Sequence, residues 1–480
     1  MSAKAPRSPQ RERRDTSDRT VAQAPRPAAA ISPARSVAFD ILTLVAQGNA
    51  HSDDLLHSSR TASLSPADRN LATALVMGTL RWQIALDARI GRLLTRPDQA
   101  PAQPVALALR MGAFQLLHMD RVPAHAVLNE SVELCRAAGH AHAAGMVNAV
   151  LRKLTAQAQP GTRSAKETKR SAPIFESSAA LAERLGHPLW LVERWASAYG
   201  REAALAICEY DQREPQAGSL FAHPGEDLGD ASLPGEAAAP PSGAALQIDD
   251  GSRLVAELAA TALPITADRA PRVWDSCAAP GGKTLVLAER LPSAAILATD
   301  ISAGRLARMA ERVRRSAHAA RVRCEVMDAA KSDPADGANA NDAAFDLILC
   351  DVPCSGTGTL ARNPEIRHRL RPADLARHAE RQRAILLGAV NRLAPGGRLL
   401  YSTCSLEAEE NEQVVEAIAA KSGVRCLPIE PLIEQLARTG ILAATPAEKL
   451  LRSAIREGSL RTIPGIQPCD GFFAALLERE

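Results

Sequence analysis

Apolar residues recur at helical spacing through the first third of the chain. Between about residues 32 and 154 they fall at i, i+3, i+4 and i+7, the pattern of a helix with one buried face. Short breaks with Pro, Ser or Asp at residues 65–68, 96–98 and 122–123 separate these stretches. The pattern predicts a compact all-α domain over residues 32–156. Its apolar stripes are Ala38, Ile41, Leu42 and Val45; Leu71, Leu75, Gly78 and Trp82; Leu109, Gly112, Ala113 and Leu116; and Val147, Val150, Leu151 and Leu154.

A different pattern begins at Arg272, where short β-rich runs alternate with helical runs. This alternation predicts an α/β domain over residues 251–480, with a parallel sheet covered by helices on both faces. The last apolar run, residues 471–477, is expected to close the sheet as an antiparallel edge strand. The expected strands are Arg272–Asp275, Ala295–Thr299, Arg321–Met327, Phe345–Cys350 and Arg398–Ser402, and the expected helices include Leu285–Arg290, Arg305–Arg315 and Leu375–Leu393.

Three segments lack such patterns. Residues 1–31 are expected to form a disordered basic tail, because residues 1–36 hold eight Lys/Arg against three Asp/Glu and few apolar residues. This tail either contacts RNA weakly or is simply solvated. Residues 157–175 are expected to be a basic linker. Residues 176–250 are expected to form a small subdomain, whose end is unusual: between Glu214 and Ser252 there are seven Asp/Glu and no Lys or Arg.

Length and composition narrow the class of protein. A chain of 480 residues is expected to form two or three domains. It has no apolar run of about 18 residues and no apolar signal segment, so we expect a cytoplasmic protein. Nine scattered cysteines fit reduced thiols better than a disulfide framework. Zinc-type spacing of Cys or His is missing, so we expect no metal, and we also expect a monomer that does not bind membranes.

A glycine-bearing turn follows the first expected strand of the α/β domain. Acidic residues lie at or near the ends of the strands that follow, and in such folds ligands bind at the carboxyl ends of the strands. The turn matches neither the Gly-x-Gly-x-x-Gly of dinucleotide sites nor a P-loop, so an adenosyl cofactor without a pyrophosphate suits it better. The candidate cofactor residues are Cys277, Ala278, Ala279, Pro280, Gly281, Gly282, Lys283, Asp300, Asp328 and Asp351.

Two cysteines fifty residues apart carry the candidate chemistry. Cys354 and Cys404 each lie in a loop just after an expected strand, and Asp351 precedes the first of them. Cytosine C5 is a poor nucleophile until a thiolate adds to C6, and such a step needs an activated cysteine. A lone cysteine is usually a small buried apolar residue. That explanation fits poorly here, because both residues lie in loops beside Pro, Thr and Ser. The spacing alone leaves open which cysteine attacks.

Several motifs together show a family resemblance. These motifs are Cys277-Ala-Ala-Pro-Gly-Gly-Lys283, Asp351-Val-Pro-Cys-Ser-Gly-Thr-Gly358, Ser402-Thr-Cys-Ser405 with Glu409-Glu-Asn411, and Asp470-Gly-Phe-Phe473. In these short motifs, residues 249–480 resemble the RNA cytosine-C5 methyltransferases of the RsmB/NOP (Sun, Fmu) family. This likeness extends from about Asp249 to the C-terminus. The helical domain resembles NusB, through the segments Asp68–Asn70, Arg110–Phe114, Ala124–Glu130 and Gly145–Arg152.

The resemblance implies a fold and a reaction. The fold is a class I, Rossmann-like methyltransferase domain after an N-terminal all-α NusB-like domain. The reaction is C5-methylation of a cytosine in 16S rRNA, of the position-967 type, with S-adenosyl-L-methionine as cofactor and RNA as partner. The resemblance also implies that Cys404 is the nucleophile, that Cys354 assists product release and that Asp351 holds N3 of the cytosine. The alternatives are the same chemistry on tRNA or another rRNA cytosine, or a non-enzymatic NusB-like RNA-binding factor.

The sequence departs from the family pattern at two places. The RNA-recognition subdomain before the cofactor turn looks shortened or degenerate, with Gly218–Pro224 where the family has an Arg-x-Asn stretch. Residues 333–343 look like a loop insertion. For RNA contact, phosphates need Lys or Arg on one face. Candidates on the helical domain are Arg69, Arg81 and Arg110, and the stretch after the Pro-Cys motif adds Arg362, Arg367, Arg369, Arg371, Arg377, Arg381 and Arg383.

Overall fold

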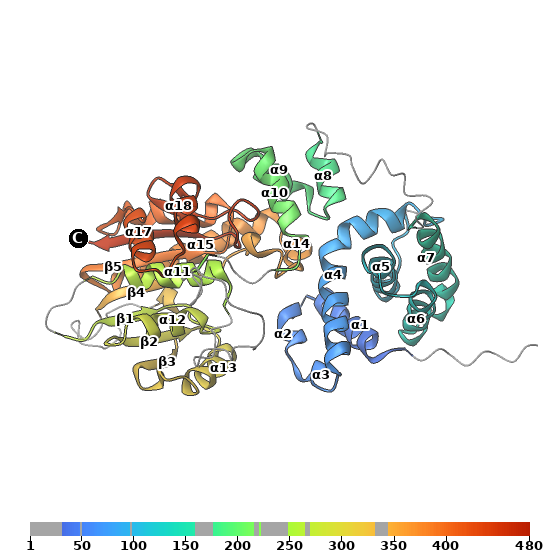
Figure 1. Ribbon diagram of the computed structural model, residues 1–480, viewed down its shortest axis with the longest axis horizontal. Helices are drawn as coiled ribbons and strands as arrows, with labels where there is room; N and C mark the ends of the chain where they lie inside the picture. Colours follow the sequence, from blue (N-terminus) through green and yellow to red (C-terminus); the bar gives the residue numbers. More distant parts are fainter. Residues whose placement is uncertain are drawn as a thin grey trace, which may run out of the picture.

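The computed structural model describes residues 31–48, 50–96, 98–158, 176–215, 220–221, 248–264, 269–331 and 344–480. Most of the expected basic tail and linker, the acidic part of the expected RNA-recognition subdomain and the expected insertion after Asp328 lie outside these residues. In Figure 1 the N-terminal helices lie on the right and the sheet domain on the left, with three helices between them at the top.

The N-terminal part of the chain is helical, as its pattern predicts. All four residues of the first stripe and of the last stripe are buried in one apolar cluster that the helices share. Ser65 caps the longest helix by accepting a hydrogen bond from the backbone N–H of Asp68, which satisfies a free donor of its first turn. The elements are α1 (Pro33–Ala46), α2 (Ser52–Leu56), α3 (Ser59–Ala62), α4 (Pro66–Gly91), α5 (Gln103–His118), α6 (Ala124–Ala137), η1 (Ala141–Ala143) and α7 (Ala144–Ala158).

A small group of helices joins this domain to the sheet domain. It consists of α8 (Ser178–Arg184), α9 (Leu189–Tyr199) and α10 (Arg201–Tyr210). Their apolar cluster includes Trp195 from α9 and also Leu360 and Leu406 from the sheet domain. Leu360 lies shortly after Cys354 and Leu406 shortly after Cys404, so these helices pack against both cysteine-bearing segments.

The sheet domain is built on parallel strands in the order β3-β2-β1-β4-β5. The last strand, β9, then pairs antiparallel with β5. Our expectation that it forms the edge of the sheet is wrong, because β8 pairs with its first part and β6 with its second part on the other side. The strands are β1 (Arg272–Asp275), β2 (Ala295–Asp300), β3 (Val322–Val326), β4 (Phe345–Asp351), β5 (Leu393–Thr403), β6 (Val424–Leu427), β7 (Ile455–Arg456), β8 (Ser459–Arg461) and β9 (Phe473–Arg479).

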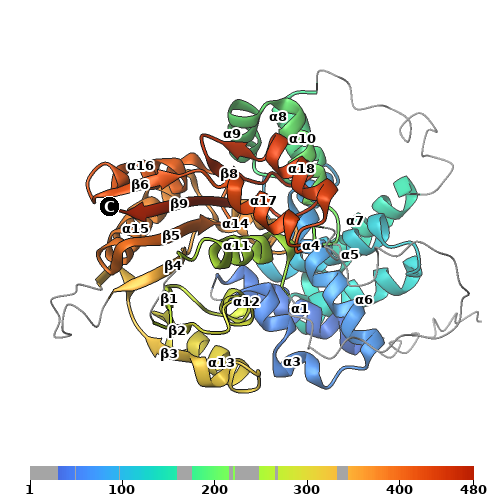
Figure 2. The ribbon, with the colours of Figure 1, turned by 60° about the vertical axis from the view of Figure 1, so that its left-hand side comes forward.

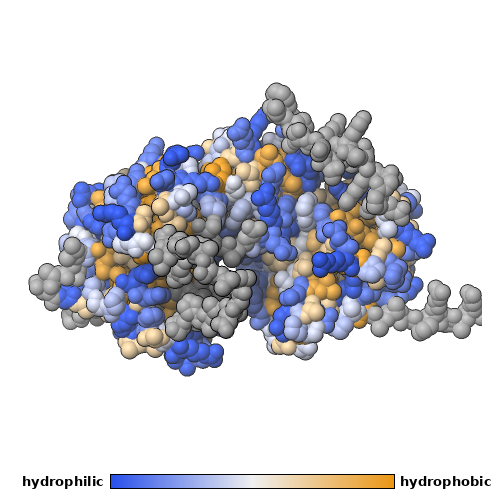
Figure 3. Space-filling view, viewed as in Figure 1, coloured by the Kyte–Doolittle hydropathy of each residue, from blue (hydrophilic) through white to orange (hydrophobic). Residues whose placement is uncertain are grey.

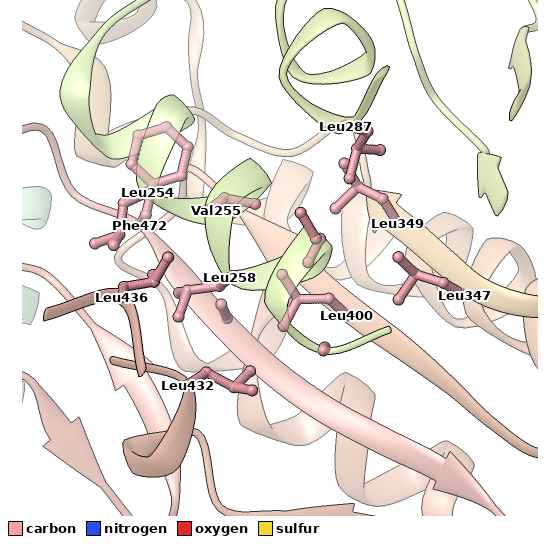
Figure 4. Packing of buried hydrophobic residues seen from close by; sticks show 14 of the residues in the cluster. Leu254, Val255, Leu258, Leu287, Leu347, Leu349, Leu400, Leu432, Leu436 and Phe472 are labelled. Carbon is pink, nitrogen blue, oxygen red and sulfur yellow. The ribbon is translucent and has the colours of Figure 1, made fainter. Parts of the chain in front are cut away.

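Helices cover both faces of this sheet (Figure 2). Along β4, Leu347 and Leu349 belong to one apolar cluster, whereas Ile348 and Cys350 belong to the other, as alternation along a strand requires. Figure 4 shows Leu347, Leu349 and Leu400 beside side chains of α11. One face carries α11 (Asp250–Thr261), α12 (Gly282–Arg290), α13 (Ala303–Arg314), α17 (Glu430–Arg438) and α18 (Ala444–Ser453), and the other carries α15 (Pro372–Asn391) and α16 (Glu412–Ala419).

The junction between the helical and sheet domains is polar and buried. It centres on α14 (Ile366–Arg369), where Arg367 donates to the backbone carbonyls of Arg81, Gly186 and Asp211 at 2.9, 3.3 and 2.9 Å. Arg81 in turn donates to the carbonyl of Ala361 at 2.9 Å.

Acidic and basic side chains extend this junction to the start of the helical domain. Glu365, 1% exposed, accepts hydrogen bonds from the backbone N–H and hydroxyl of Ser52 at 3.1 and 2.9 Å. Arg369 donates to the carbonyls of Val45 and Ala50 at 2.7 and 2.6 Å. The junction is therefore held mainly by side chains of the sheet domain that contact backbone of the helical domain.

This finding corrects part of the expected RNA surface. We expected Arg81, Arg367 and Arg369 to contact phosphates, but their guanidinium groups are already bonded to backbone carbonyls of the junction. Spacing along the sequence could not show this, because a run of arginines has the same appearance on a solvated helix and in a domain junction. Arg377 and Arg381 do lie on the exposed side of α15.

Candidate active site

The carboxyl ends of four parallel strands meet at one edge of the sheet. There β1 ends at Asp275, β2 at Asp300, β4 at Asp351 and β5 at Thr403. Strand β3 ends at Val326, and Asp328 follows two residues later. The sheet order therefore gathers most of the residues selected from the sequence at a single edge, the one where ligands bind in folds of this kind.

The turn between β1 and α12 has the backbone of a ligand-binding turn. Gly281 has a φ of 98° and stands directly before the first turn of α12. A side chain there would be strained by the φ, and its Cβ would lie 2.7 Å from Cγ of Met309. The backbone N–H of Ala278 donates to the carbonyl of Thr299 at 2.8 Å, which fixes the turn against β2. The glycine is therefore required by both conformation and space.

This turn forms one wall of a cavity of about 1350 Å³. Asp351 and Cys404 line the cavity too, and so do α2 and α4 of the helical domain. Of the expected site residues, Cys354, Gly281, Asp300 and Asp328 are not in its lining. In Figure 3 the molecule is hollowed between the two domains. Its lining includes His51, Asp53, Asp54, Asn70, Thr73, Met77 and Arg81 from the helical domain, and Cys277, Ala278, Ala279, Pro280, Gly282, Lys283, Arg305, Met309, Asp351, Arg362 and Cys404 from the sheet domain.

Lys283 links the turn to the end of β4. Its Nζ lies 2.8 Å from Oδ2 of Asp351, and it donates to the hydroxyl of Ser252 at 3.0 Å. Burial disfavours the charged ammonium, but Asp351 outweighs this and the pKa of Lys283 is raised. The hydroxyl of Ser402 donates to the other oxygen of Asp351 at 2.7 Å. The carboxylate of Asp351 is therefore held in one orientation from two sides.

The two cysteines lie in contact. Their Sγ atoms are 3.3 Å apart, within hydrogen-bond distance for sulfur, so the structure brings together the residues that the sequence places fifty positions apart. The hydrogen bond to Cys404, together with burial, raises the pKa of the Cys354 thiol well above its usual range. Cys404 lines the cavity, whereas Cys354 is partly exposed but is not in the lining. The pair is thus asymmetric, with one sulfur facing the cavity and the other kept as a thiol.

The remaining carboxylates around the turn have different surroundings. Asp300 is 4% exposed, and its Oδ1 accepts a hydrogen bond from the backbone N–H of Ser302 at 2.8 Å. Burial raises the pKa of Asp275 to about 7, although the hydroxyl of Thr284 donates to it at 2.6 Å. Asp328 is partly exposed, and its Oδ1 accepts from the backbone N–H of Ala330 at 3.1 Å. Of these three carboxylates, only Asp275 lines the cavity.

Comparison with known proteins identifies the family. The sequence profile of 16S rRNA methyltransferase RsmB/F matches residues 262–478, and that of the NusB family matches residues 32–156. The ribosomal RNA small subunit methyltransferase B of Xanthomonas campestris is 34% identical over 450 residues, which are 88% of this chain and 92% of that protein. The chain belongs to the RsmB/F family of 16S rRNA methyltransferases. A protein of the same name from Erwinia tasmaniensis is 34% identical over 397 residues, 77% of this chain and 85% of that protein.

A solved structure supports the fold. The crystal structure of PH0851 superposes with a TM-score of 0.65 at 21% identity, and the match covers 94% of this chain and all of that one. The expected fold class, a Rossmann-like methyltransferase domain preceded by a NusB-like helical domain, is confirmed. In the part of the chain that the structure describes, no helix is long and apolar enough to cross a membrane.

Several functional features of this RsmB/F methyltransferase were missed in the sequence. The contribution of α2 and α4 to the cavity has no local signal, because it arises from the docking of one domain on the other. Lys283 was selected as part of the cofactor turn, yet its ammonium points to Asp351. Glu410 was visible only as part of a motif, and its contacts to both cysteine segments needed the fold.

Proposed function

We propose that this protein transfers the methyl group of S-adenosyl-L-methionine to C5 of a cytosine in 16S rRNA, through a covalent bond between Cys404 and C6. The observation that carries the proposal is the pair of thiols 3.3 Å apart beside the ion pair of Lys283 and Asp351. Membership of the RsmB/F family and relatives named ribosomal RNA small subunit methyltransferase B support the substrate. We propose the cytosine of the position-967 type as the target.

The residues at the strand ends suit an adenosyl cofactor. When bound, S-adenosyl-L-methionine would supply an electrophilic methyl group on a sulfonium. The turn Cys277–Lys283 would lie against it, Asp300 would accept hydrogen bonds from its ribose hydroxyls, Asp328 would meet the adenine amine, and Asp351 would lie near its reactive end. The acidic residues at this edge would repel a pyrophosphate, which argues against a dinucleotide.

Cys404 is the better placed nucleophile. It lines the cavity, and the ammonium of Lys283 lies close enough for the charge of Cys404 to raise the pKa of that lysine. The thiolate form of Cys404 is the nucleophile that the reaction needs. Addition of this thiolate to C6 forms a C–S bond and moves electron density to N3 and C5, so that C5 can attack the methyl group. Asp351 would contact N3 and pass to it a proton from the ammonium of Lys283, 2.8 Å away, which neutralises the added density.

Product release reverses the addition. Water in the open cavity would take the C5 proton, the electron pair of that C–H bond re-forms the double bond between C5 and C6, the C–S bond breaks, and the thiolate of Cys404 leaves. Cys354 is in contact with the departing sulfur and keeps its own proton, so it can donate a hydrogen bond to that thiolate. We therefore assign Cys354 to release.

RNA would enter between the two domains. The cavity is lined by residues of both domains, and its size exceeds the roughly 300–1000 Å³ of a typical small-molecule pocket. A cytosine in paired RNA would have to leave its stack to reach Cys404. We propose that the NusB-like helices contact the RNA strand on either side of the target base.

All nine cysteines are free, which fits a reducing compartment, and we propose that the protein acts in the cytoplasm.

Two experiments test this function. Bisulfite sequencing of rRNA and tRNA from a strain that lacks the gene should show the loss of one methylated cytosine in 16S rRNA. Persistence of every 16S methylation, or a loss in tRNA instead, would overturn the proposed substrate.

In vitro, Cys354→Ala should accumulate a protein–RNA adduct that survives denaturant, because Cys404 then adds to the cytosine but leaves it slowly. An adduct from Cys404→Ala instead would reverse the two roles.

A further inference from the structure

Each of the two cysteines is followed by a serine, and both serines bind the same carboxylate. The hydroxyl of Ser405 donates to Oε2 of Glu410 at 2.5 Å, and the hydroxyl of Ser355 donates to that same oxygen. The backbone N–H of Ser355 also donates to Oε1 at 2.8 Å. Glu410 therefore connects the residue after Cys354 to the residue after Cys404.

The carboxylate of Glu410 is enclosed and fully used. Glu410 is 0% exposed, and Gln382 from α15 completes its contacts by donating its amide to Oε1 at 2.9 Å. The group accepts four hydrogen bonds, which matches an ionised carboxylate, an acceptor only. All four donors are neutral, so nothing in this set of contacts cancels the charge. The same Gln382 amide reaches the carbonyl of Pro353 at 3.1 Å, which adds a further link to the cysteine segment.

The two thiols consequently face charges of opposite sign. Besides Cys404 and burial, the negative charge of Glu410 disfavours ionisation of Cys354. The positive charge of Lys283 acts on Cys404. A buried charge in a medium of low polarity acts strongly over short distances. The arrangement thus separates two chemically identical groups that lie in contact.

We propose that Glu410 is a positioning residue that locks the two cysteine segments together and directs the negative charge of the thiol pair to Cys404. The proposal rests on the proposed function for its purpose, because only a two-thiol mechanism needs one sulfur ionised and the other protonated. Glu410 itself does not line the cavity and touches neither RNA nor cofactor in this assignment. Its effect passes through the serines and through the electrostatic field at Cys354.

The test is alkylation of the protein by a small neutral haloacetamide at fixed pH, without RNA or cofactor, with each labelled cysteine identified by peptide mass spectrometry. In the native protein, Cys404 should react at least about tenfold faster than Cys354, because only thiolates are nucleophilic. In Glu410→Gln the ratio should fall at least about twofold, since one of the charges that disfavour ionisation of Cys354 is gone while burial and Cys404 remain. An unchanged ratio in Glu410→Gln overturns the proposal.

A matched control lies in the same segment. Glu407 is also a buried acid, 3% exposed, but its partners are Arg194 and Trp195. Glu407→Gln should keep the native labelling ratio. A change in the ratio equal to that of Glu410→Gln would show a general loosening of the segment instead.

If Glu410→Gln does not fold, Ser355→Ala tests the proposal. It removes one donor and keeps the carboxylate, so the ratio should change by less than about threefold, while the adduct yield on RNA rises because Cys354 moves away from Cys404 and release slows. A native adduct yield in Ser355→Ala overturns the locking role.

Activity separates this proposal from the function itself. In Glu410→Gln, kcat for methyl transfer should fall while KM for RNA stays at its native value, because no RNA contact is removed. The labelling result does not depend on any substrate. A changed labelling ratio in a protein that methylates no RNA would therefore leave the role of Glu410 standing and remove the proposed function.

Discussion

The two segments that carry the cysteines are anchored on different parts of the molecule. The Pro-Cys segment, residues 352–371, runs into α14 and is fixed on the helical domain through Glu365, Arg367 and Arg369. The Thr-Cys segment, residues 402–412, is fixed on α9, where Arg194 binds Glu407 and Glu409 at 2.7 Å each. Two sulfur atoms in contact thus depend on two separate supports.

This difference shows what each support does. The anchor of the Pro-Cys segment passes through the domain junction, so its position reports whether the helical domain is docked. The anchor of the Thr-Cys segment lies on α9, outside the helical domain, although the group of helices α8–α10 also contacts the Pro-Cys segment through Leu360. A shift of about 1 Å between reacting groups can lower a rate about a hundredfold. Docking of the helical domain should therefore affect Cys354 more than Cys404.

The largest expected loss of activity comes from a change in the Thr-Cys segment itself. Cys404→Ala removes the proposed nucleophile, and loss of a nucleophile costs about 10³-fold or more in kcat. Transfer of labelled methyl groups to 16S rRNA measures this loss. Cys426→Ala serves as the control, because Cys426 is exposed and distant in the sheet, and it should keep native activity. Methylation by Cys404→Ala at more than about a tenth of the native rate would contradict the assignment.

The next effect tests the anchor of the Pro-Cys segment. Arg367→Met removes three hydrogen bonds from a buried guanidinium to backbone carbonyls of the junction, so the free energy of unfolding should fall by about 3 kcal/mol. Methyl transfer should fall about tenfold, because the segment loses its fixed position. Urea denaturation and the methyl-transfer assay measure the two effects. Arg377→Met changes an exposed arginine nearby, and it should alter stability by less than about 0.5 kcal/mol. Equal results for both variants would mean that the junction does not support the site.

A smaller effect is expected at the anchor of the Thr-Cys segment. Arg194→Met removes the partner of Glu407 and Glu409. The guanidinium is 37% exposed, so solvent screens these ion pairs and the unfolding free energy should fall by only about 1 kcal/mol. Adduct formation by the Arg194→Met, Cys354→Ala double variant measures how far the nucleophile has moved. A stability loss as large as that of Arg367→Met would erase the difference between the two supports.

The smallest effect is a pH dependence of the Pro-Cys anchor. Burial lowers the pKa of His368 to about 4 from 6.5, and its Nε2 lies 2.9 Å from the carbonyl of Leu80. Between these pH values the unfolded chain binds more protons than the folded one. Stability is therefore lost as the pH falls from 6.5 towards 4. Between pH 7 and pH 6, where only the start of this range is crossed, His368→Gln should remove less than about 1 kcal/mol of this loss, measured as the unfolding free energy. If the unfolding free energy of the variant and of the native protein had the same pH dependence, His368 would not contribute to it.

The sequence revealed the repeating parts of the fold well. The apolar stripes of α1 and α7 are buried as spacing predicts, and β1 begins and ends where its pattern does. Strand β9 was recognised as antiparallel but misplaced at the edge, because the partners β6 and β8 are short and carry little pattern. Arg367 and Arg369 were interpreted as part of an RNA-binding run. Their charge alone does not show whether an arginine faces solvent or donates to a buried backbone carbonyl.

The chemistry was predictable where it depends on residue type at a strand end. Cys354, Cys404 and Asp351 were selected for that reason, and the fold brings them to one place. The contacts that distinguish the two thiols, from Lys283 and Glu410, join residues far apart in the chain. Such pairings follow from strand order and loop path, and no local spacing encodes them.

Backbone hydrogen bonds connect the segment just before β9 to Cys404. The N–H of Gly471 donates to the carbonyl of Gly358 at 2.8 Å, and the N–H of Gly358 donates to the carbonyl of Cys404 at 2.9 Å. A Cβ on Gly358 would lie 2.3 Å from the carbonyl oxygen of Gly471, so neither strand nor loop can carry a side chain there. During synthesis, residues 470–473 leave the ribosome after both cysteines. The two thiols are therefore synthesised before Gly471, whose backbone holds the loop at Gly358 beside Cys404.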